Sequence, residues 1–176
     1  HKSSGKTLVS IGLCAAYRRR GMQVAAFKKG PDYIDPAWLT RASGRPCWNL
    51  DFFTMGHDEI HSCFEERRQD ADVAVVEGNK GLFDGLDVEG SDSNAALAVR
   101  LGLPVILVID VTGITRGIAP LLTGYTGFDP DVQIVGVILN RVAGPRQESK
   151  LRAAIERYSD LPVLGAIGRT SGLGIE

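Results

Sequence analysis

A short run of small and polar residues near the start of the chain has the composition of a phosphate-binding loop. Ser3-Ser4-Gly5-Lys6-Thr7 leads directly into a segment with helical periodicity. Backbone N–H groups in such a loop point at phosphate oxygens, and the start of the following helix adds its dipole. The run is the end of a Walker A motif, in which we expect Lys6 to contact the β- and γ-phosphates of ATP and the Thr7 hydroxyl to reach Mg²⁺.

Acidic residues in two later segments are placed as ligands of a metal–phosphate complex. Glu77 ends the apolar run Asp72–Glu77, which is the arrangement of a Walker B carboxylate. Asp32 and Asp35 lie in one loop, between Pro31 and Pro36. The expected metal ligands are Thr7, Asp32, Asp35 and Glu77. The expected catalytic residues are Lys6, Asp32, Asp35 and Glu77.

Apolar runs alternate with amphipathic segments along the chain, which is the rhythm of βαβ units. The expected strands cover residues 23–28, 72–77, 104–110, 133–140 and 162–167. The expected helices cover residues 6–21, 37–42, 57–69, 92–101 (capped by Ser91), 114–125 and 145–158, and the rest of 30–50 is expected to be loop. This pattern predicts an α/β fold of the P-loop NTPase type, a doubly wound, mostly parallel sheet with helices on both faces.

Polar residues end four of the expected strands. Lys28, Glu77, Asp110 and Asn140 each follow an apolar run. Ligands of doubly wound sheets bind beyond the carboxyl ends of the strands, so we expect all four side chains to face one crevice. Lys28 is placed to neutralise an incoming carboxylate, although a solvated strand-end lysine fits the pattern equally well.

The composition excludes several classes of partner. Formal net charge is -1, which gives no general attraction to nucleic acid or to an anionic membrane. No apolar run has the length of a membrane span. Three widely spaced cysteines, Cys14, Cys47 and Cys63, form no metal or disulfide pattern and are expected to be reduced thiols. We therefore expect a cytoplasmic protein with neither nucleic acid nor membrane as its partner.

Four stretches of the sequence carry a family resemblance. They are Lys28-Lys29-Gly30-Pro31-Asp32-Tyr33-Ile34-Asp35-Pro36, Gly44-Arg45-Pro46 with Asn49-Leu50-Asp51, Val75-Val76-Glu77-Gly78 through Gly81-Leu82-Phe83-Asp84-Gly85, and Gly136-Val137-Ile138-Leu139-Asn140-Arg141-Val142. Together they resemble the N-terminal synthetase domain of the cobyrinate (or hydrogenobyrinate) a,c-diamide synthase family. Dethiobiotin synthetase is similar more distantly, with the same kind of nucleotide site.

The resemblance implies an ATP-dependent carbon–nitrogen ligase of cobalamin biosynthesis. In that family ATP phosphorylates the c- and then the a-acetate of a corrinoid, and ammonia derived from glutamine displaces each phosphate. Carried over by position, Lys6 and Thr7 hold phosphates and Mg²⁺, and Asp32, Asp35 and Glu77 are the metal and phosphate carboxylates. Tyr33, Ile34 and Asp84 contact the acetate being activated, and Asn140 meets adenine.

The resemblance also implies neighbouring parts of a longer protein. A P-loop normally follows a buried strand, and that strand would precede His1. A glutamine amidotransferase domain would follow Glu176. We therefore expect residues 1–176 to be one ATP-binding synthetase domain, truncated at its N-terminus and without its glutaminase domain.

Several alternatives stay open. A ligase similar to dethiobiotin synthetase would act on a small diamine, and a nickel-sirohydrochlorin a,c-diamide synthase would act on another tetrapyrrole. A nucleotide switch that binds a protein partner is a third alternative. The ParA/MinD type of Walker A motif has an extra lysine, which would lie at position 1 of this chain. The chain has His1 there, and Lys2 is one place off, so a dimer-switch ATPase of that type is disfavoured. A homodimer is also left open.

Overall fold

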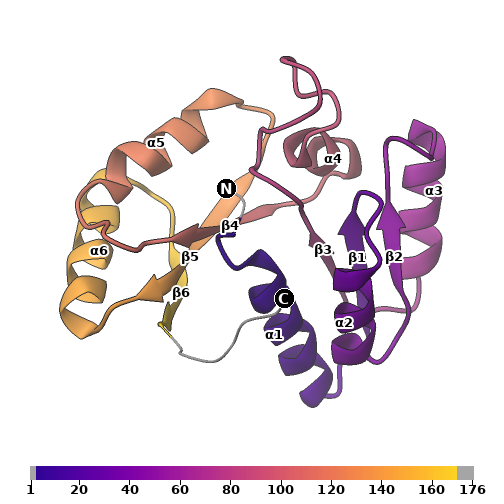
Figure 1. The fold of residues 1–176 in the computed structure, drawn as a ribbon, viewed down its shortest axis with the longest axis horizontal. Helices are drawn as coiled ribbons and strands as arrows, with labels where there is room; N and C mark the ends of the chain where they lie inside the picture. The colour runs from indigo at the N-terminus through magenta and orange to yellow at the C-terminus, as the bar shows by residue number, and fades with distance from the viewer. Residues whose placement is uncertain (1–2, 170–176) are drawn as a thin grey trace. The chain divides into compact units, whose positions relative to one another are not determined.

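The computed structural model describes residues 3–169, and within them the chain folds as two compact units (Figure 1). The N-terminal unit is Lys6–Arg100, and the C-terminal unit is residues 101–169 together with Ser3–Gly5. The helices are α1 (Lys6–Arg19), α2 (Ile34–Ser43), α3 (His57–Arg68), α4 (Asn94–Leu101), α5 (Ile118–Phe128) and α6 (Pro145–Tyr158). The strands are β1 (Val24–Lys29), β2 (Cys47–Leu50), β3 (Val73–Glu77), β4 (Val105–Asp110), β5 (Ile134–Val142) and β6 (Val163–Gly168).

The N-terminal unit is built on a parallel sheet with the strand order β2-β1-β3. Because side chains alternate along a strand, β1 buries residues on both faces of this sheet. On one face, Val24 and Ala26 pack with Cys14 of α1 and Leu39 of α2. On the other face, the Phe27 ring lies 5.0 Å from the ring of Phe64 in α3. Helices therefore cover both faces of the sheet, as the sequence predicts.

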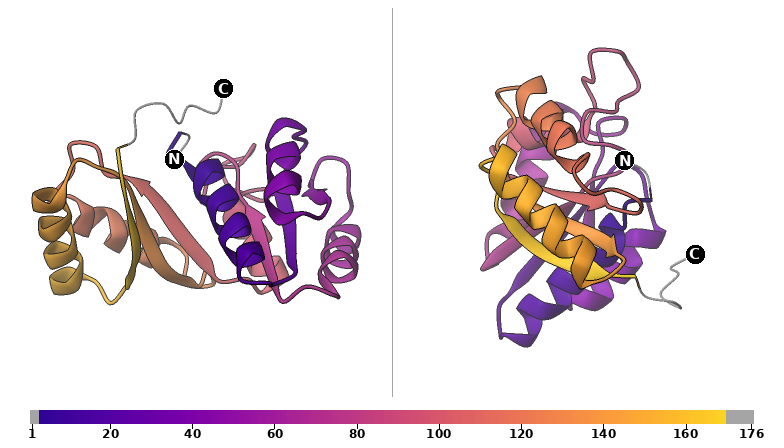
Figure 2. Two further views of the ribbon diagram at one scale, coloured as in Figure 1. Left: turned by 90° about the horizontal axis from the view of Figure 1, so that it is seen from below. Right: turned by 90° about the vertical axis from the view of Figure 1, so that its left-hand side faces the viewer.

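The C-terminal unit is built on a second parallel sheet, with the strand order β4-β5-β6. Helices α5 and α6 pack against each other, and α6 also contacts β5 and β6 (Figure 2). The buried side chains of this unit include residues of both helices and of the central strand: Ile118, Leu122, Val137, Leu139, Leu151 and Ile155. In the described part of the chain, no helix is both long and apolar enough to cross a membrane.

The parallel strands confirm the predicted α/β fold. The sequence did not predict that the described strands form two sheets of three. One sheet of six strands and two sheets of three strands would show the same alternation of strands and helices along the sequence. Pairing depends on contacts between distant residues, which periodicity does not report.

Two predictions for residues 30–50 were wrong. Helix α2 begins at Ile34 rather than at residue 37, because Pro36 lies in its first turn, where a backbone N–H has no partner within the helix. Strand β2 was predicted as loop. It is only four residues long and partly exposed, so it lacks the continuous apolar run that marks the other strands.

Two helix starts also differ from the prediction. Helix α4 begins at Asn94, and its cap is Ser93 rather than Ser91, because the Ser93 hydroxyl accepts the Ala96 N–H at 3.1 Å. Helix α5 begins at Ile118 instead of residue 114. The Gln147 side-chain amide donates to the carbonyls of Val111 and Ile114, at 2.7 and 2.8 Å, and holds that segment in turns.

Candidate functional site

A cluster of polar side chains lies at the carboxyl end of the β2-β1-β3 sheet. Its members come from the first turn of α1, the end of β1, the start of α2 and the end of β3. The Thr7 hydroxyl donates to Glu77 Oε1 at 2.5 Å and lies 3.3 Å from Asp35 Oδ2. All four predicted metal ligands lie in this unit, and three of them, Thr7, Asp35 and Glu77, are in direct contact through Thr7.

Lys28 lies at the centre of this cluster. Its Nζ is 2.6 Å from Asp35 Oδ2, 3.0 Å from Glu77 Oε1 and 4.0 Å from Asp32 Oδ2. Burial alone would lower the pKa of Lys28, but Glu77 and Asp35 outweigh burial and hold that pKa above its ordinary value. Lys28 is therefore an ammonium at neutral pH, and it is only 4% exposed. The alternative of a solvated strand-end lysine is therefore wrong.

The two aspartates of the proline-bounded loop have different surroundings. Asp32 Oδ1 accepts the backbone N–H groups of Ile34 and Asp35, at 2.9 and 3.3 Å, so it binds the first two N–H groups of α2. The Asn49 side chain at the end of β2 donates to the Asp32 carbonyl at 2.7 Å. Asp35 instead directs its carboxylate at Lys28 and Thr7. Asp35 is therefore the better placed ligand, and Asp32 positions the loop.

Glu77 has a buried oxygen without a partner. The residue is 2% exposed, and its Oε2 has no hydrogen-bond donor. Burial raises the pKa of Glu77 above its ordinary value, and Lys28 and Thr7 oppose this only in part. An oxygen of this kind, next to a threonine hydroxyl, fits a hard divalent cation.

No three His, Cys, Asp or Glu side chains of residues 3–169 are arranged as a protein-only metal site. This agrees with the coordination habits of Mg²⁺, which proteins hold through one or two carboxylates while phosphates and water supply the other ligands. The donor set of Thr7, Glu77 and Asp35 fits that pattern.

Lys6 and Asp84 belong to the same electrostatic neighbourhood. Burial lowers the pKa of Lys6, and the Lys28 ammonium lowers it further. Glu77, Asp35 and Asp84 act in the opposite direction. Asp84 is therefore one of the carboxylates that raise the pKa of Lys6 against the effect of burial.

The other predicted substrate residues are exposed. Tyr33 is 83% exposed and Ile34 is 47% exposed, at the start of α2. Asp84 is exposed in the loop that joins β3 to α4, and its Oδ2 accepts the Gly81 N–H at 2.9 Å. All three side chains are open to a ligand that approaches the N-terminal unit.

Asn94 fixes the first part of the β3–α4 loop, and sequence reasoning missed it. Its side-chain amide donates to the carbonyls of Asn79 and of Gly81, the latter at 2.7 Å, and its Oδ1 accepts the Asn79 N–H at 3.1 Å. A Cβ on Gly78 would lie 2.7 Å from Asn94 Oδ1, so the glycine after Glu77 is required by packing. The only signal in the sequence is an asparagine at a helix start.

The rest of the phosphate loop belongs to the C-terminal unit. Asn140 is 4% exposed, and its Nδ2 donates to the Ser4 carbonyl at 2.8 Å. Gly5 has φ +91°, and a Cβ there would lie 2.1 Å from Asn140 Nδ2, so only glycine fits this position. Ser4 Oγ is buried without a partner, whereas Ser3 is exposed. Asn140 thus supports the loop from β5, and its contact with adenine stays a prediction.

Each unit places one pair of the predicted strand-end residues side by side. Lys28 and Glu77 are register partners on β1 and β3. Asp110 and Asn140 are register partners on β4 and β5, and Arg141 donates to Asp110 at 2.8 Å. A single crevice for all four stays a prediction.

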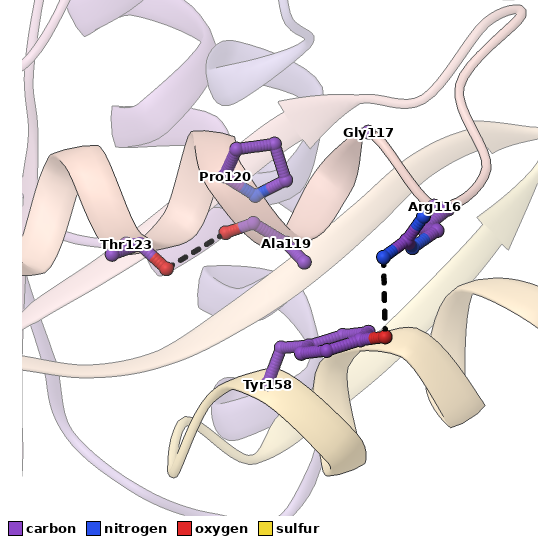
Figure 3. Close-up of a pocket in the computed structure, with 6 residues that line it drawn as sticks. All are labelled: Arg116, Gly117, Ala119, Pro120, Thr123 and Tyr158. Atoms are coloured by element: carbon purple, nitrogen blue, oxygen red, sulfur yellow. Dashed lines mark hydrogen bonds between the residues drawn. The ribbon is translucent and has the colours of Figure 1, made fainter.

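A separate hollow lies between α5 and α6 in the C-terminal unit (Figure 3). Its volume is about 530 Å³, and its lining residues are Arg116, Gly117, Ala119, Pro120, Thr123 and Tyr158. Arg116 donates to the Tyr158 hydroxyl at 3.3 Å. None of the predicted site residues lines this hollow, so it is distinct from the candidate site.

Comparison with known proteins identifies the family. Residues 3–175 match the CbiA family, described as the CobQ/CobB/MinD/ParA nucleotide binding domain. The chain belongs to this family. The resemblance seen in the sequence is confirmed as well, since 175 residues are 55% identical to the cobyrinate a,c-diamide synthase of Magnetococcus marinus. That match covers 99% of this chain and 38% of the relative.

Two further comparisons define the extent of the likeness. The cobyrinate a,c-diamide synthase of Methanosarcina acetivorans is 44% identical over 179 residues, which cover 98% of this chain and 36% of that relative. The chain thus spans less than two fifths of the length of these relatives. The crystal structure of the hydrogenase maturation factor HypB from Archaeoglobus fulgidus has a TM-score of 0.58 at 14% identity, covers 93% of this chain and 76% of that chain, and supports the fold alone.

Proposed function

We propose that this nucleotide-binding domain uses ATP and Mg²⁺ to phosphorylate the a- and c-acetate carboxylates of a corrinoid such as cobyrinate, so that ammonia can displace the phosphate and leave an amide. One observation carries the proposal: Thr7, Asp35 and Glu77 converge at the carboxyl edge of a parallel sheet, in a chain that is 55% identical to a cobyrinate a,c-diamide synthase. Ligands of such sheets bind at this edge.

The chemistry asks for positioning and charge neutralisation more than for a protein nucleophile. A carboxylate acceptor is already ionised at neutral pH, so the first step needs no general base. Lys6, from the Walker A sequence, would neutralise the phosphates, and Ser3, Ser4 and Gly5 would bind them through the loop. Tyr33, Ile34 and Asp84 would contact the acceptor.

Thr7, Glu77 and Asp35 would hold Mg²⁺ together with the phosphates. When bound, the ion would neutralise charge that develops between the phosphates. Lys28 would keep the two carboxylates in place, because its ammonium contacts both of them. Asp32 would act on the same site through the position of its loop.

We also propose that the domain is part of a longer cytoplasmic protein whose glutaminase domain supplies the ammonia. The cobyrinate a,c-diamide synthases that it resembles are more than twice as long as this chain, which supports this idea. The substrate-activating step itself would need only ATP, Mg²⁺ and the acceptor.

The test is an amidation assay with the protein at its full natural length, ATP, Mg²⁺, cobyrinate and an ammonium salt. Amide and ADP should form in equal amounts. Lys6→Ala should abolish both products together with nucleotide binding, whereas Lys150→Ala, at an exposed lysine of α6, should leave them unchanged. Wild-type protein that binds ATP but amidates no corrinoid would refute the proposal.

The same preparation separates the alternatives. A ligase similar to dethiobiotin synthetase would bind diaminopelargonate in a calorimetric titration and would ignore cobyrinate. A nickel-sirohydrochlorin substrate would be amidated in preference to cobyrinate. A nucleotide switch would hydrolyse ATP slowly, respond to a protein partner and show no effect of any tetrapyrrole.

A further inference from the structure

Lys29 is a buried cation that the proposed chemistry does not use. Because side chains alternate along β1, Lys28 points to the face with α1 and α2, and Lys29 points to the opposite face. Lys29 is 5% exposed at the carboxyl end of the strand. Burial of a lysine side chain is costly without a partner, so its contacts have to be accounted for.

The partner of Lys29 is an acid from the loop after β3. Lys29 Nζ lies 3.7 Å from Asp92 Oδ2. Burial lowers the pKa of Lys29, and Asp92 opposes this effect. The Lys29 ammonium also lies 5.8 Å from the centre of the Phe52 ring, in the segment after β2. One side chain at the end of the central strand therefore contacts the segments that follow both of its neighbours.

Asp92 also binds the part of the β3–α4 loop that contains Asp84. Its other oxygen, Oδ1, accepts the Leu86 N–H at 2.7 Å. A Cβ on Gly85 would lie 2.7 Å from the same oxygen, so the backbone beside Asp84 rests directly on Asp92. Asp92 thus connects a fixed point on β1 with the two residues that follow Asp84 in the sequence.

The loop needs such a connection because it has little regular structure of its own. Residues 78–93 contain neither helix nor strand, and loops of this length in compact domains are usually functional. Asn94 fixes its beginning through Asn79 and Gly81. Asp87 fixes its tip through Ser91. Among the described contacts of this loop, the ion pair with the sheet is made by Asp92.

We infer that the Lys29–Asp92 ion pair is a positioning device, which sets the place of Asp84 over the carboxyl end of the β2-β1-β3 sheet and thereby the affinity for the acceptor carboxylate. The inference rests on the proposed function for the identity of the acceptor. The ion pair itself and its contact with the loop are independent of that function. Lys29 and Asp92 touch no reacting atom in this account, so both are positioning residues.

Asp92→Asn is the decisive variant, because it removes the charge that Lys29 needs and keeps both side-chain size and an oxygen for the Leu86 N–H. Asp87→Asn is its matched control, since Asp87 lies in the same loop, is exposed and bonds Ser91 instead of a lysine. Both are made in the protein at its full natural length, together with Lys29→Met and the double variant Lys29→Met/Asp92→Asn.

Two measurements then decide the inference. Backbone hydrogen exchange in residues 84–86, outside the Asp87–Ser91 contact, should accelerate in Asp92→Asn and remain at the wild-type rate in Asp87→Asn. The KM for cobyrinate should rise about tenfold or more in Asp92→Asn, because small misplacements of a binding group are costly, while the KM for ATP stays within about twofold. Asp92→Asn should add nothing to Lys29→Met, since the two residues act as a pair.

Each contrary result has a distinct meaning. Exchange that is equal in the Asp92 and Asp87 variants overturns the ion pair as a fixing device. Faster exchange with an unchanged KM for cobyrinate overturns its positioning role. A wild-type protein that amidates no corrinoid refutes the proposed function, and the exchange experiment still decides whether the ion pair holds the loop.

Discussion

Lys28 and Glu77 are register partners on neighbouring parallel strands, and Lys28 Nζ lies 3.0 Å from Glu77 Oε1. Both side chains are buried, and the pair is completed by Asp35, 2.6 Å from the same ammonium. A buried ion pair of this kind contributes little net stability, but loss of one partner leaves the other charge uncompensated. Their pairing at the carboxyl edge therefore links the stability of the domain to its proposed chemistry.

Lys28→Met should destabilise the protein strongly. Loss of the ammonium leaves Glu77 buried beside Asp35 without a cation, a change that typically costs about 3–5 kcal/mol. Unfolding by urea, followed by circular dichroism in the absence of nucleotide and metal, measures this cost. The double variant Lys28→Met/Glu77→Gln should recover part of it. A double variant as unstable as the sum of the two single ones would show that the pair is not coupled.

Glu77→Gln should reduce turnover much more than nucleotide affinity. The amide keeps an oxygen near Thr7 but removes the charge proposed to hold Mg²⁺, and charge stabilisation by a metal is worth several kcal/mol, or at least about 100-fold in rate. Steady-state kinetics give the turnover, and calorimetric titration gives the affinity for ATP. Glu66→Gln, at an exposed carboxylate of α3, is the control. Equal losses in rate and affinity would contradict the metal-binding role.

Asp84→Asn should raise the KM for the corrinoid and leave the KM for ATP nearly unchanged. Asparagine retains an oxygen for the Gly81 N–H, which Asp84 accepts at 2.9 Å, so the turn is preserved while the exposed carboxylate is lost. We expect a rise of about tenfold, equivalent to one good polar contact. Asp87→Asn again serves as the control. An effect confined to the KM for ATP would place Asp84 at the nucleotide instead.

The helices and strands that hold the site were largely predictable, because the features that mark them are local. The start of α1 follows the phosphate loop, and β1, β3 and β5 are apolar runs that end in Lys29, Glu77 and Val142, within two residues of the prediction. Strand β2 was missed because four partly exposed residues have no periodicity to read.

The contacts between side chains were less predictable than the strands. The sequence places Lys28 and Glu77 at the same sheet edge, but their direct contact depends on a register between residues 49 positions apart. The contact of Asp32 with the first N–H group of α2 was not predicted, because the start of that helix was misplaced. No contact was predicted for Lys29, because its partner Asp92 lies in a loop that follows no period.

Asn140→Asp distinguishes support of the phosphate loop from recognition of the base. The Asn140 side chain donates to the Ser4 carbonyl at 2.8 Å in a buried position, and a carboxylate there would replace the donor by an oxygen that faces another oxygen. The lost hydrogen bond should lower the free energy of unfolding by about 1–3 kcal/mol and weaken ATP and GTP equally. Gln133→Glu, an exposed position at the start of the same strand region, controls for the added charge. An altered preference between ATP and GTP, with unchanged stability, would instead assign Asn140 to adenine.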